Sequence, residues 1–220
     1  MKYYFTLFLL CATWLSIAQY NGKIGLTLGA TNYITDTNLL SSKSGKGFTF
    51  GVMSISEFNE NFTFVLEMNY NQHSVKLIGR ENELADPEDV KFNLQEFSLP
   101  LTFNWFFHEA NYFKFGVNAG PSLHFGHEFK LVDDAKSSYV LDPLYASPDN
   151  LRFDTYNEKV SFNVFAAVGL CVQYDEIIMA NLKYYRSITD PYRQAPIVGT
   201  RDEITGQDSY FAFAVTYFFL

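Results

Sequence analysis

The sequence predicts an all-β protein: a closed, up-and-down, antiparallel transmembrane β-barrel of about eight strands. Three observations predict this fold class. The N-terminus has the pattern of a secretory signal peptide, apolar and polar residues alternate in eight later segments, and the connections between those segments are alternately short and long. Together they describe a chain that is exported and then spans a membrane with strands.

The N-terminal segment has the parts of a signal peptide. A short positive head precedes an apolar run over residues 3–15, and the small residues Ser16 and Ala18 follow at the positions that define a cleavage site. The run is too short for a membrane-spanning helix, which needs about 20 residues. We therefore expect cleavage after Ala18, so that residues 1–18 are the signal peptide and residues 19–220 form the barrel domain.

Composition fits alternating strands and excludes one class of partner. Aromatic residues make up 18% of the chain, yet its mean hydropathy is only −0.06. Alternation explains this combination, because it hides a lipid-facing surface from an average. The formal net charge of −8 argues against nucleic acid as a partner, since phosphate binding needs a basic face. After the signal peptide the only cysteine is Cys171, so we expect no internal disulfide.

Eight segments show the period-two pattern of strands whose two faces meet different surroundings. They are residues 23–31, 48–56, 62–71, 93–107, 113–125, 160–174, 177–187 and 209–220. The second segment loses its pattern after Val52, which favours a bulge there. Pro100 removes a ladder hydrogen bond inside a strongly alternating segment, and a bulge would accommodate it.

Short and long connections alternate along the whole chain. The short ones are residues 57–61, 108–112 and 175–176, and the long ones are residues 32–47, 78–91, 126–159 and 188–208. In an up-and-down barrel this order puts every short turn at one end and every long loop at the other. Outer-membrane barrels have this asymmetry, with short periplasmic turns and longer extracellular loops. We therefore expect the protein in the outer membrane of a Gram-negative bacterium.

Volume decides which face of the strands points outward. One face carries nearly all the bulky apolar residues, and the other carries small and polar ones. The interior of an eight-stranded barrel is just filled by side chains, so the bulky face must contact lipid. The other face then brings charged residues into the interior, where we expect them to pair and hold the barrel together; a proton or ion path is the alternative. These residues are Lys23, Glu67, Glu96, Lys114 and Lys183.

Several segments resemble a known family. They are the Gly-rich residues 22–29, LEMNY at 66–70, FSLPL at 97–101, GVNAGP at 116–121 and the aromatic C-terminal segment. These segments are similar to the small outer-membrane β-barrel domain of Bacteroidota that is often called PorT-like. The resemblance implies the barrel fold and the outer membrane, and it suggests an accessory role in secretion. It also implies that the barrel-insertion machinery reads Tyr217, Phe219 and Leu220 near the C-terminus.

One pair of residues has catalytic potential. Ser122 and His124 lie two positions apart on the expected inner face, with Glu128 close by, and a Ser–His pair with a carboxylate can carry out acyl transfer. Some eight-stranded outer-membrane barrels are lipid-modifying enzymes. However, this spacing on one strand does not secure a hydrogen bond between nucleophile and base. We therefore expect no enzyme activity and a structural role for His124.

The two longest loops are the expected contact surface for a partner. The loop at residues 126–159 is acidic, but it lacks the ligand spacing and the invariant glycine of a calcium loop. We therefore expect neither a metal nor a cofactor. Tyr145, Tyr192 and Arg193 are the loop residues that we expect to contact a partner.

The sequence therefore favours a non-enzymatic outer-membrane barrel with a structural or accessory role in the cell envelope. Its expected partners are outer-membrane lipid, the barrel-insertion machinery and an envelope protein bound through the long outer loops. Two alternatives stay open. One is a lipid-modifying outer-membrane enzyme that uses Ser122 and His124. The other is a soluble periplasmic ligand-binding barrel, which would require the apolar face to point inward.

Overall fold

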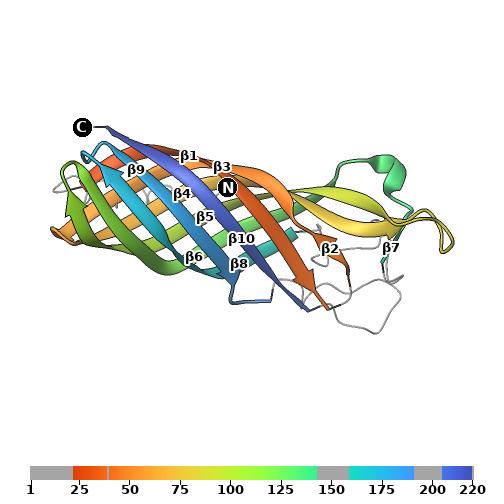
Figure 1. The fold of residues 1–220 in the computed structure, drawn as a ribbon. Coiled ribbons are helices and arrows are strands. Elements are labelled where there is room, and N and C mark those ends of the chain that lie inside the picture. Colours follow the sequence, from red (N-terminus) through yellow and green to blue (C-terminus); the bar gives the residue numbers. More distant parts are fainter. Residues whose placement is uncertain (1–21, 39, 143–158, 191–204, 220) are drawn as a thin grey trace, which may run out of the picture.

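A computed structural model describes residues 22–38, 40–142, 159–190 and 205–219. Eight long strands dominate it: β1 (Gly22–Thr37), β3 (Gly45–Asn59), β4 (Phe62–Arg80), β5 (Glu88–Ala110), β6 (Phe113–Leu131), β8 (Lys159–Tyr174), β9 (Ile178–Ser187) and β10 (Gly206–Phe219). The short strands β2 (Ser42–Lys43) and β7 (Val140–Leu141) and the 3-10 turn η1 (Asp134–Lys136) lie at one end (Figure 1). The expected signal peptide lies outside the described residues. Among those residues, no helix is long and apolar enough to cross a bilayer.

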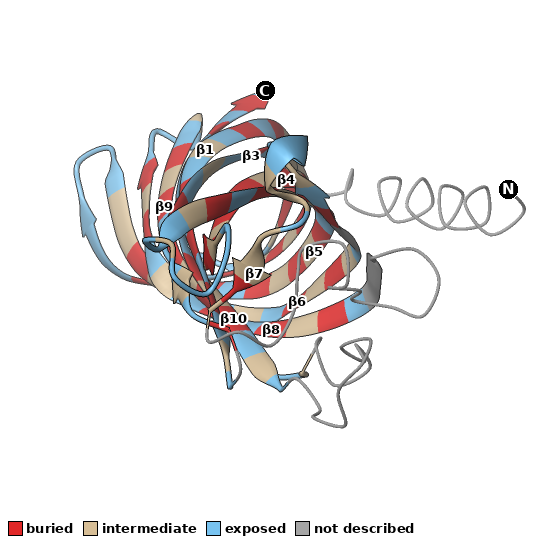
Figure 2. Ribbon diagram, turned by 90° about the vertical axis from the view of Figure 1, so that its right-hand side faces the viewer, coloured by how far each residue is buried: buried red, intermediate tan, exposed pale blue. Residues whose placement is uncertain are grey.

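The eight long strands form a closed ring. Each pairs antiparallel with its neighbours in the order β1-β3-β4-β5-β6-β8-β9-β10, and β10 pairs with β1. Figure 2 looks into this ring from the end that carries β7. The predicted fold class, a closed up-and-down antiparallel barrel of eight strands, is confirmed.

Tight turns join β3 to β4, β5 to β6 and β8 to β9 at one end of the barrel, on the left in Figure 1. In the last of them Asp175 and Glu176 have φ angles of 45° and 57°, as the two central residues of a type I′ hairpin turn require. In the first, the side-chain oxygen of Asn59 accepts hydrogen bonds from the backbone N–H groups of Asn61 and Phe62. The predicted short connections are therefore hairpin turns, and this end is called the tight-turn end below.

The strands extend further towards the other end, the long-loop end, than the sequence pattern predicts. β4 continues to Arg80 and β5 begins at Glu88, so the predicted loop at residues 78–91 is largely a strand hairpin. β1 likewise continues to Thr37. The sequence-based strands are too short because the hydrophobic pattern inverts along these strands, and only the half nearer the tight turns matches a lipid-facing strand.

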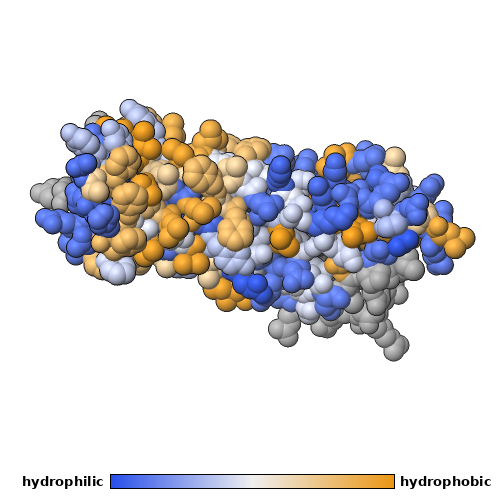
Figure 3. Space-filling view, in the orientation of Figure 1, coloured by the Kyte–Doolittle hydropathy of each residue, from blue (hydrophilic) through white to orange (hydrophobic). Residues whose placement is uncertain are grey.

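The inversion is clear on β4. Near the tight-turn end Met68 is exposed on the outer face and Asn69 is buried. Further along the same pleat, the outer face carries Lys76 while Leu77 is buried. The second half is therefore built like a soluble barrel, with its apolar residues inside. Figure 3 shows the division: apolar residues gather towards the tight-turn end, and polar residues cover the other half.

A bulge in β6 lies close to the boundary between the two patterns. The register between β5 and β6 shifts between Gln95 and Phe97, and Gly126 of β6 has a φ of 68°. A glycine in this left-handed conformation is typical of a G1 bulge. The extra residue changes the parity of β6, so that both His124 and Phe129 are buried in the interior.

Pro100 does not mark a bulge. The register of β5 is continuous across it on both sides, although the ladder to β4 lacks the pairs opposite Leu99 and Pro100, as expected where a proline removes a donor. The irregularity predicted within residues 48–56 lies just beyond that segment, between Glu57 and Asn59.

The bulky residues of the tight-turn half lie on the outside, as the volume argument predicts. Phe97 is 58% exposed and Leu170 is 57% exposed, although both are apolar. Such residues from all eight long strands form an apolar belt: Leu26, Leu28, Phe50, Phe62, Met68, Phe97, Phe103, Trp105, Phe107, Phe113, Phe162, Val168, Leu170, Leu182, Phe211, Phe213, Val215, Tyr217 and Phe219. An exposed apolar surface of this extent is expected where a protein contacts a membrane.

We expect Leu170→Arg to lower the free energy of unfolding in lipid vesicles by about 2–4 kcal/mol, because the charge would enter hydrocarbon. Ser74→Arg is the matched control, since Ser74 lies on the outer face of β4 beyond the belt and should change that free energy by less than about 1 kcal/mol. Denaturant titration of both variants in the same vesicles measures the difference. Equal effects would mean that the belt does not contact hydrocarbon.

Candidate functional site

The lumen consists of a polar layer between two apolar clusters. The cluster nearer the tight turns contains Met53, Ile55, Val65, Phe106, Cys171, Met179 and Phe218. The cluster nearer the long loops contains Tyr33, Leu40, Val75, Leu77, Val90, Phe92, Leu94, Phe129, Leu141, Phe165, Ala167, Tyr185, Tyr210 and Ala212. Because each cluster is buried, both separate the polar layer from solvent at the two ends of the barrel.

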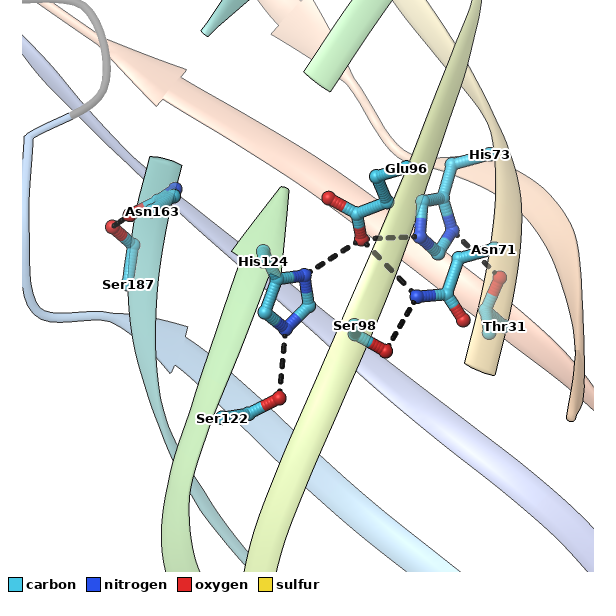
Figure 4. Close-up of polar contacts among 9 residues, drawn as sticks. All are labelled: Thr31, Asn71, His73, Glu96, Ser98, Ser122, His124, Asn163 and Ser187. Atoms are coloured by element: carbon cyan, nitrogen blue, oxygen red, sulfur yellow. Dashed lines mark hydrogen bonds and ion pairs between the residues drawn. The ribbon is translucent and has the colours of Figure 1, made fainter. Parts of the chain in front are cut away.

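A carboxylate between two histidines is the centre of the polar layer (Figure 4). Glu96 Oε1 lies 2.9 Å from His124 Nδ1 and 3.3 Å from His73 Nε2. The other nitrogens of the two rings are bonded as well: His124 Nε2 lies 3.0 Å from Ser122 Oγ, and His73 Nδ1 lies 2.8 Å from Thr31 Oγ1. One chain of hydrogen bonds therefore links side chains of four strands, β1, β4, β5 and β6. Its members are called the Glu96 cluster below: Thr31, His73, Glu96, His124 and Ser122.

Aromatic rings enclose the Glu96 cluster. The ring of His124 lies 4.1 Å from that of Phe165, and the ring of His73 is stacked 4.5 Å from that of Tyr33, measured between centroids. These contacts leave little room for water beside the imidazoles. A low-dielectric setting of this kind strengthens a hydrogen bond that is made and raises the cost of one that is lost.

Ser122, His124 and Glu96 follow one another in the order of an acyl-transfer triad: hydroxyl, imidazole, carboxylate. Ser122 and His124 were identified from the sequence, but Glu96 comes from the neighbouring strand β5. Its position beside His124 follows from the register between β5 and β6, which pairs Ser98 with His124. Alternation within a single strand gives no information about that register. The side chain of Glu128, which was expected beside the pair, lies outside the described side chains.

This triad is sealed inside the barrel. Ser122 and His124 are 0% exposed and Glu96 is 1% exposed. An acyl chain cannot reach the Ser122 hydroxyl in this conformation, because the barrel wall and the apolar clusters surround it. The geometry suits a hydrogen-bonded strut between strands better than a site that must admit a substrate.

A second buried pair joins opposite parts of the ring. Lys183 of β9 forms an ion pair with Glu67 of β4, and both residues are 3% exposed. Asn69 Nδ2 donates a hydrogen bond of 3.0 Å to the second oxygen of Glu67. A cavity of about 10 Å³ lies beside the pair, lined by residues that include Glu67, Asn69 and Lys183, which is room for about one water molecule.

The structure does not bring Lys23 and Lys114 into this interior layer. Lys23 forms an ion pair with Glu176 of the β8–β9 turn, and its hydrogen bond lowers the pKa of the Glu176 carboxyl. Lys114 lines a cleft of about 160 Å³ at the same rim, with Glu109 and Glu176. Both lysines lie near the tight turns, where the inner face opens to solvent and a charge is only partly desolvated.

The remaining candidates divide between the rim and the undescribed loops. Tyr217 and Phe219, from the expected insertion signal, are outward-facing and about half exposed on β10, whereas Leu220 lies outside the described residues. Tyr145, Tyr192 and Arg193 also lie outside them. Within the part of the chain that is described, no group of three or more His, Cys, Asp or Glu side chains is arranged to hold a metal ion.

Beyond the apolar belt, a raised sheet extends at the long-loop end. It consists of the outer ends of β4, β5 and β6 together with β2, β7 and η1 (Figure 1). Ion pairs fasten its parts to one another: Arg80 to Asp142 at 3.3 Å, and Lys136 to Glu88 at 2.6 Å. The inner side of this sheet contributes Val75, Leu77 and Leu141 to the apolar cluster of the lumen nearer the long loops, so the sheet packs on the same core as the barrel.

Comparison with known proteins identifies a family. The model of the outer membrane protein beta-barrel domain matches residues 17–193. Among solved structures, the chain is similar to OprG of Pseudomonas aeruginosa (12% identity over 90% of this chain and 96% of that chain, TM-score 0.49). It is also similar to Ail of Yersinia pestis (13%, 90% and 99%, TM-score 0.42) and to the outer membrane enzyme PagL (11%, 86% and 97%, TM-score 0.42). No curated protein matches the chain.

Proposed function

Because this chain belongs to the outer membrane protein beta-barrel domain family, we propose that it is a non-enzymatic, non-conducting barrel of the outer membrane that presents its raised sheet to another component of the cell envelope. The tight turns then lie in the periplasm and the raised sheet outside the cell. This orientation follows the general asymmetry of outer-membrane barrels.

The closed lumen carries the proposal. Apolar clusters lie on both sides of the polar layer, and two of the buried carboxylates in it have partners: Glu67 pairs with Lys183, and Glu96 contacts two histidines. The cavity beside the first pair measures only about 10 Å³. A continuous water path needs a wider barrel than eight strands provide.

The raised sheet is the proposed binding surface outside the membrane. A barrel that only filled the membrane would not need strands of 19 and 23 residues, as β4 and β5 have, since about 9–11 residues span the bilayer. Exposed segments positioned by a rigid scaffold are where binding residues are usually found. The resemblance to PorT-like proteins supports an accessory role, of the secretion-associated kind, for this surface.

Reconstitution of the full-length protein in planar lipid bilayers tests the closed lumen. We expect no stepwise conductance above the bare bilayer, because the two apolar clusters and the paired charges block the path. A porin of known conductance, reconstituted in the same bilayers, serves as a check that the assay detects channels. Steady channels in the unmodified protein would overturn the proposal.

A lipid-modifying enzyme is the second candidate, and the bonded sequence Ser122, His124, Glu96 is the observation that favours it. Because that sequence is sealed, we expect the mass spectrum of the outer-membrane lipids to be the same with the unmodified protein, with Ser122→Ala and without the protein. Loss or gain of an acyl chain that depends on the Ser122 hydroxyl would establish the enzyme instead.

Cell fractionation separates the proposal from a soluble ligand-binding barrel. We expect the protein in the outer-membrane fraction, with a gel mobility that changes on boiling as it does for closed barrels, and with Gln19 as its first residue after signal cleavage. Recovery from the soluble periplasm would favour the ligand-binding barrel, which the outward-facing belt opposes.

A further inference from the structure

A row of lysines crosses the outer wall of the raised sheet. Lys43 on β2 is the cross-strand partner of Lys76 on β4, and Lys76 is in turn the partner of Lys91 on β5. Lys43 and Lys91 are exposed, and Lys76 is partly exposed. Three positive charges therefore lie side by side on adjacent strands; they are called the lysine row below.

The lysine row is positively charged, whereas the protein as a whole carries a negative net charge. The chain has 24 acidic and 16 basic side chains, and like charges placed opposite each other across strands destabilise a sheet. One carboxylate lies in the row: Asp89, bonded to Lys43 at 2.7 Å. This hydrogen bond lowers the pKa of the Asp89 carboxyl, and the charges of Lys76 and Lys91 lower it further. Lys76 and Lys91 form no ion pair with a described residue, so the row keeps a surplus of positive charge.

The height of the row indicates what it meets. On β4 the last outward ring of the belt region is Tyr70, and on β5 it is Phe97; Lys76 and Lys91 each follow six positions further out. At a rise of about 3.3 Å per residue and a tilt of about 40°, the row lies about 15 Å beyond these rings. Aromatic rings at the edge of a belt mark the level of the headgroups. The row therefore lies above that level, where it faces the parts of neighbouring outer-leaflet lipids that extend beyond their acyl chains.

We propose that the lysine row binds the phosphorylated saccharide headgroup of a lipid in the outer leaflet, of the lipopolysaccharide kind. The sheet wall faces the neighbouring lipids, and a headgroup that carries several anionic groups spans several lysines at once. The lysine ammonium group is a point charge with three hydrogen-bond donors, so it can bind phosphate without requiring one fixed geometry. The inference rests on the proposed orientation, with the raised sheet outside the cell.

Binding of purified rough-type lipopolysaccharide to the full-length protein in nonionic detergent tests the inference. We expect the double variant K76Q/K91Q to bind about 25-fold more weakly, since each basic side chain near an anionic surface contributes about fivefold. The matched control is K23Q/K114Q, which also removes two lysine charges, but at the tight-turn rim. It should bind within about twofold of the unmodified protein. A binding defect of equal size in both variants, or in neither, would overturn the inference.

Two further arms identify the ligand chemistry. The same lipopolysaccharide after chemical removal of its phosphates should bind the unmodified protein about as weakly as the intact lipid binds K76Q/K91Q. Inorganic pyrophosphate should not displace the intact lipid at matched concentration; displacement would show a site for free phosphate and overturn the assignment to a lipid.

Denaturant titration should show K76Q/K91Q to be at least as stable as the unmodified protein, because the substitutions remove a like-charge pair. Channel activity would overturn the proposed function without affecting these results.

Discussion

Replacing Lys183 by methionine is expected to lower the free energy of unfolding by about 3–5 kcal/mol. The substitution leaves the carboxylate of Glu67 inside the barrel, 3% exposed, with its hydrogen bond from Asn69 but without its cation. Breaking a buried ion pair by removing one partner is costly because the remaining charge stays desolvated. Denaturant titration in lipid vesicles, followed by the fluorescence of Trp105 in the apolar belt, measures the loss.

Two further variants show whether the cost belongs to the buried charge. The double variant E67Q/K183M removes both charges and should recover most of the loss, because a buried pair replaced by neutral residues is often close to neutral in stability. Lys23→Met breaks the partly exposed ion pair with Glu176 and should cost less than about 1 kcal/mol. A Lys183→Met variant no less stable than Lys23→Met would contradict the assignment of Glu67 and Lys183 as an interior strut.

The sequence predicts the wall of this barrel well because alternation is a property of single strands. The outward direction of Phe97, Phe103 and Trp105 follows from volume alone, and these residues are exposed. The outer half is harder to predict, because there water replaces lipid outside and the sense of the pattern inverts. Val75 and Leu77 therefore face inward in a segment whose pleat is unbroken, and a search for outward apolar residues ends the strand too early.

The interior is less predictable, because its contacts depend on register and on the curvature of the ring. Glu67 and Lys183 were both expected inside, but they lie 116 positions apart on strands that are not neighbours. His73 lies two positions beyond the end of the alternating segment, so the sequence pattern does not place it in the interior. The bulge at Gly126, which keeps His124 and Phe129 on one face, has no signal in the sequence beyond the glycine itself.

Glu96→Leu is expected to lower the free energy of unfolding by at least about 3 kcal/mol, because it leaves the nitrogens of two buried imidazoles, those of His73 and His124, without their shared acceptor. Glu96→Gln keeps an oxygen at that position and should cost about 1–2 kcal/mol. Ser122→Ala, at the end of the same hydrogen-bond chain, should cost about 1 kcal/mol. Denaturant titration in lipid vesicles ranks the three variants.

The sign of the Glu96→Leu effect decides between a strut and a catalytic site. Active sites are commonly kept at a cost in stability, so that replacing their polar residues by apolar ones of similar size makes the protein more stable. A strut behaves in the opposite way, since its hydrogen bonds join β1, β4, β5 and β6 in the closed ring. A Glu96→Leu variant that is more stable than the unmodified protein would therefore contradict the structural role and favour the acyl-transfer reading of Ser122 and His124.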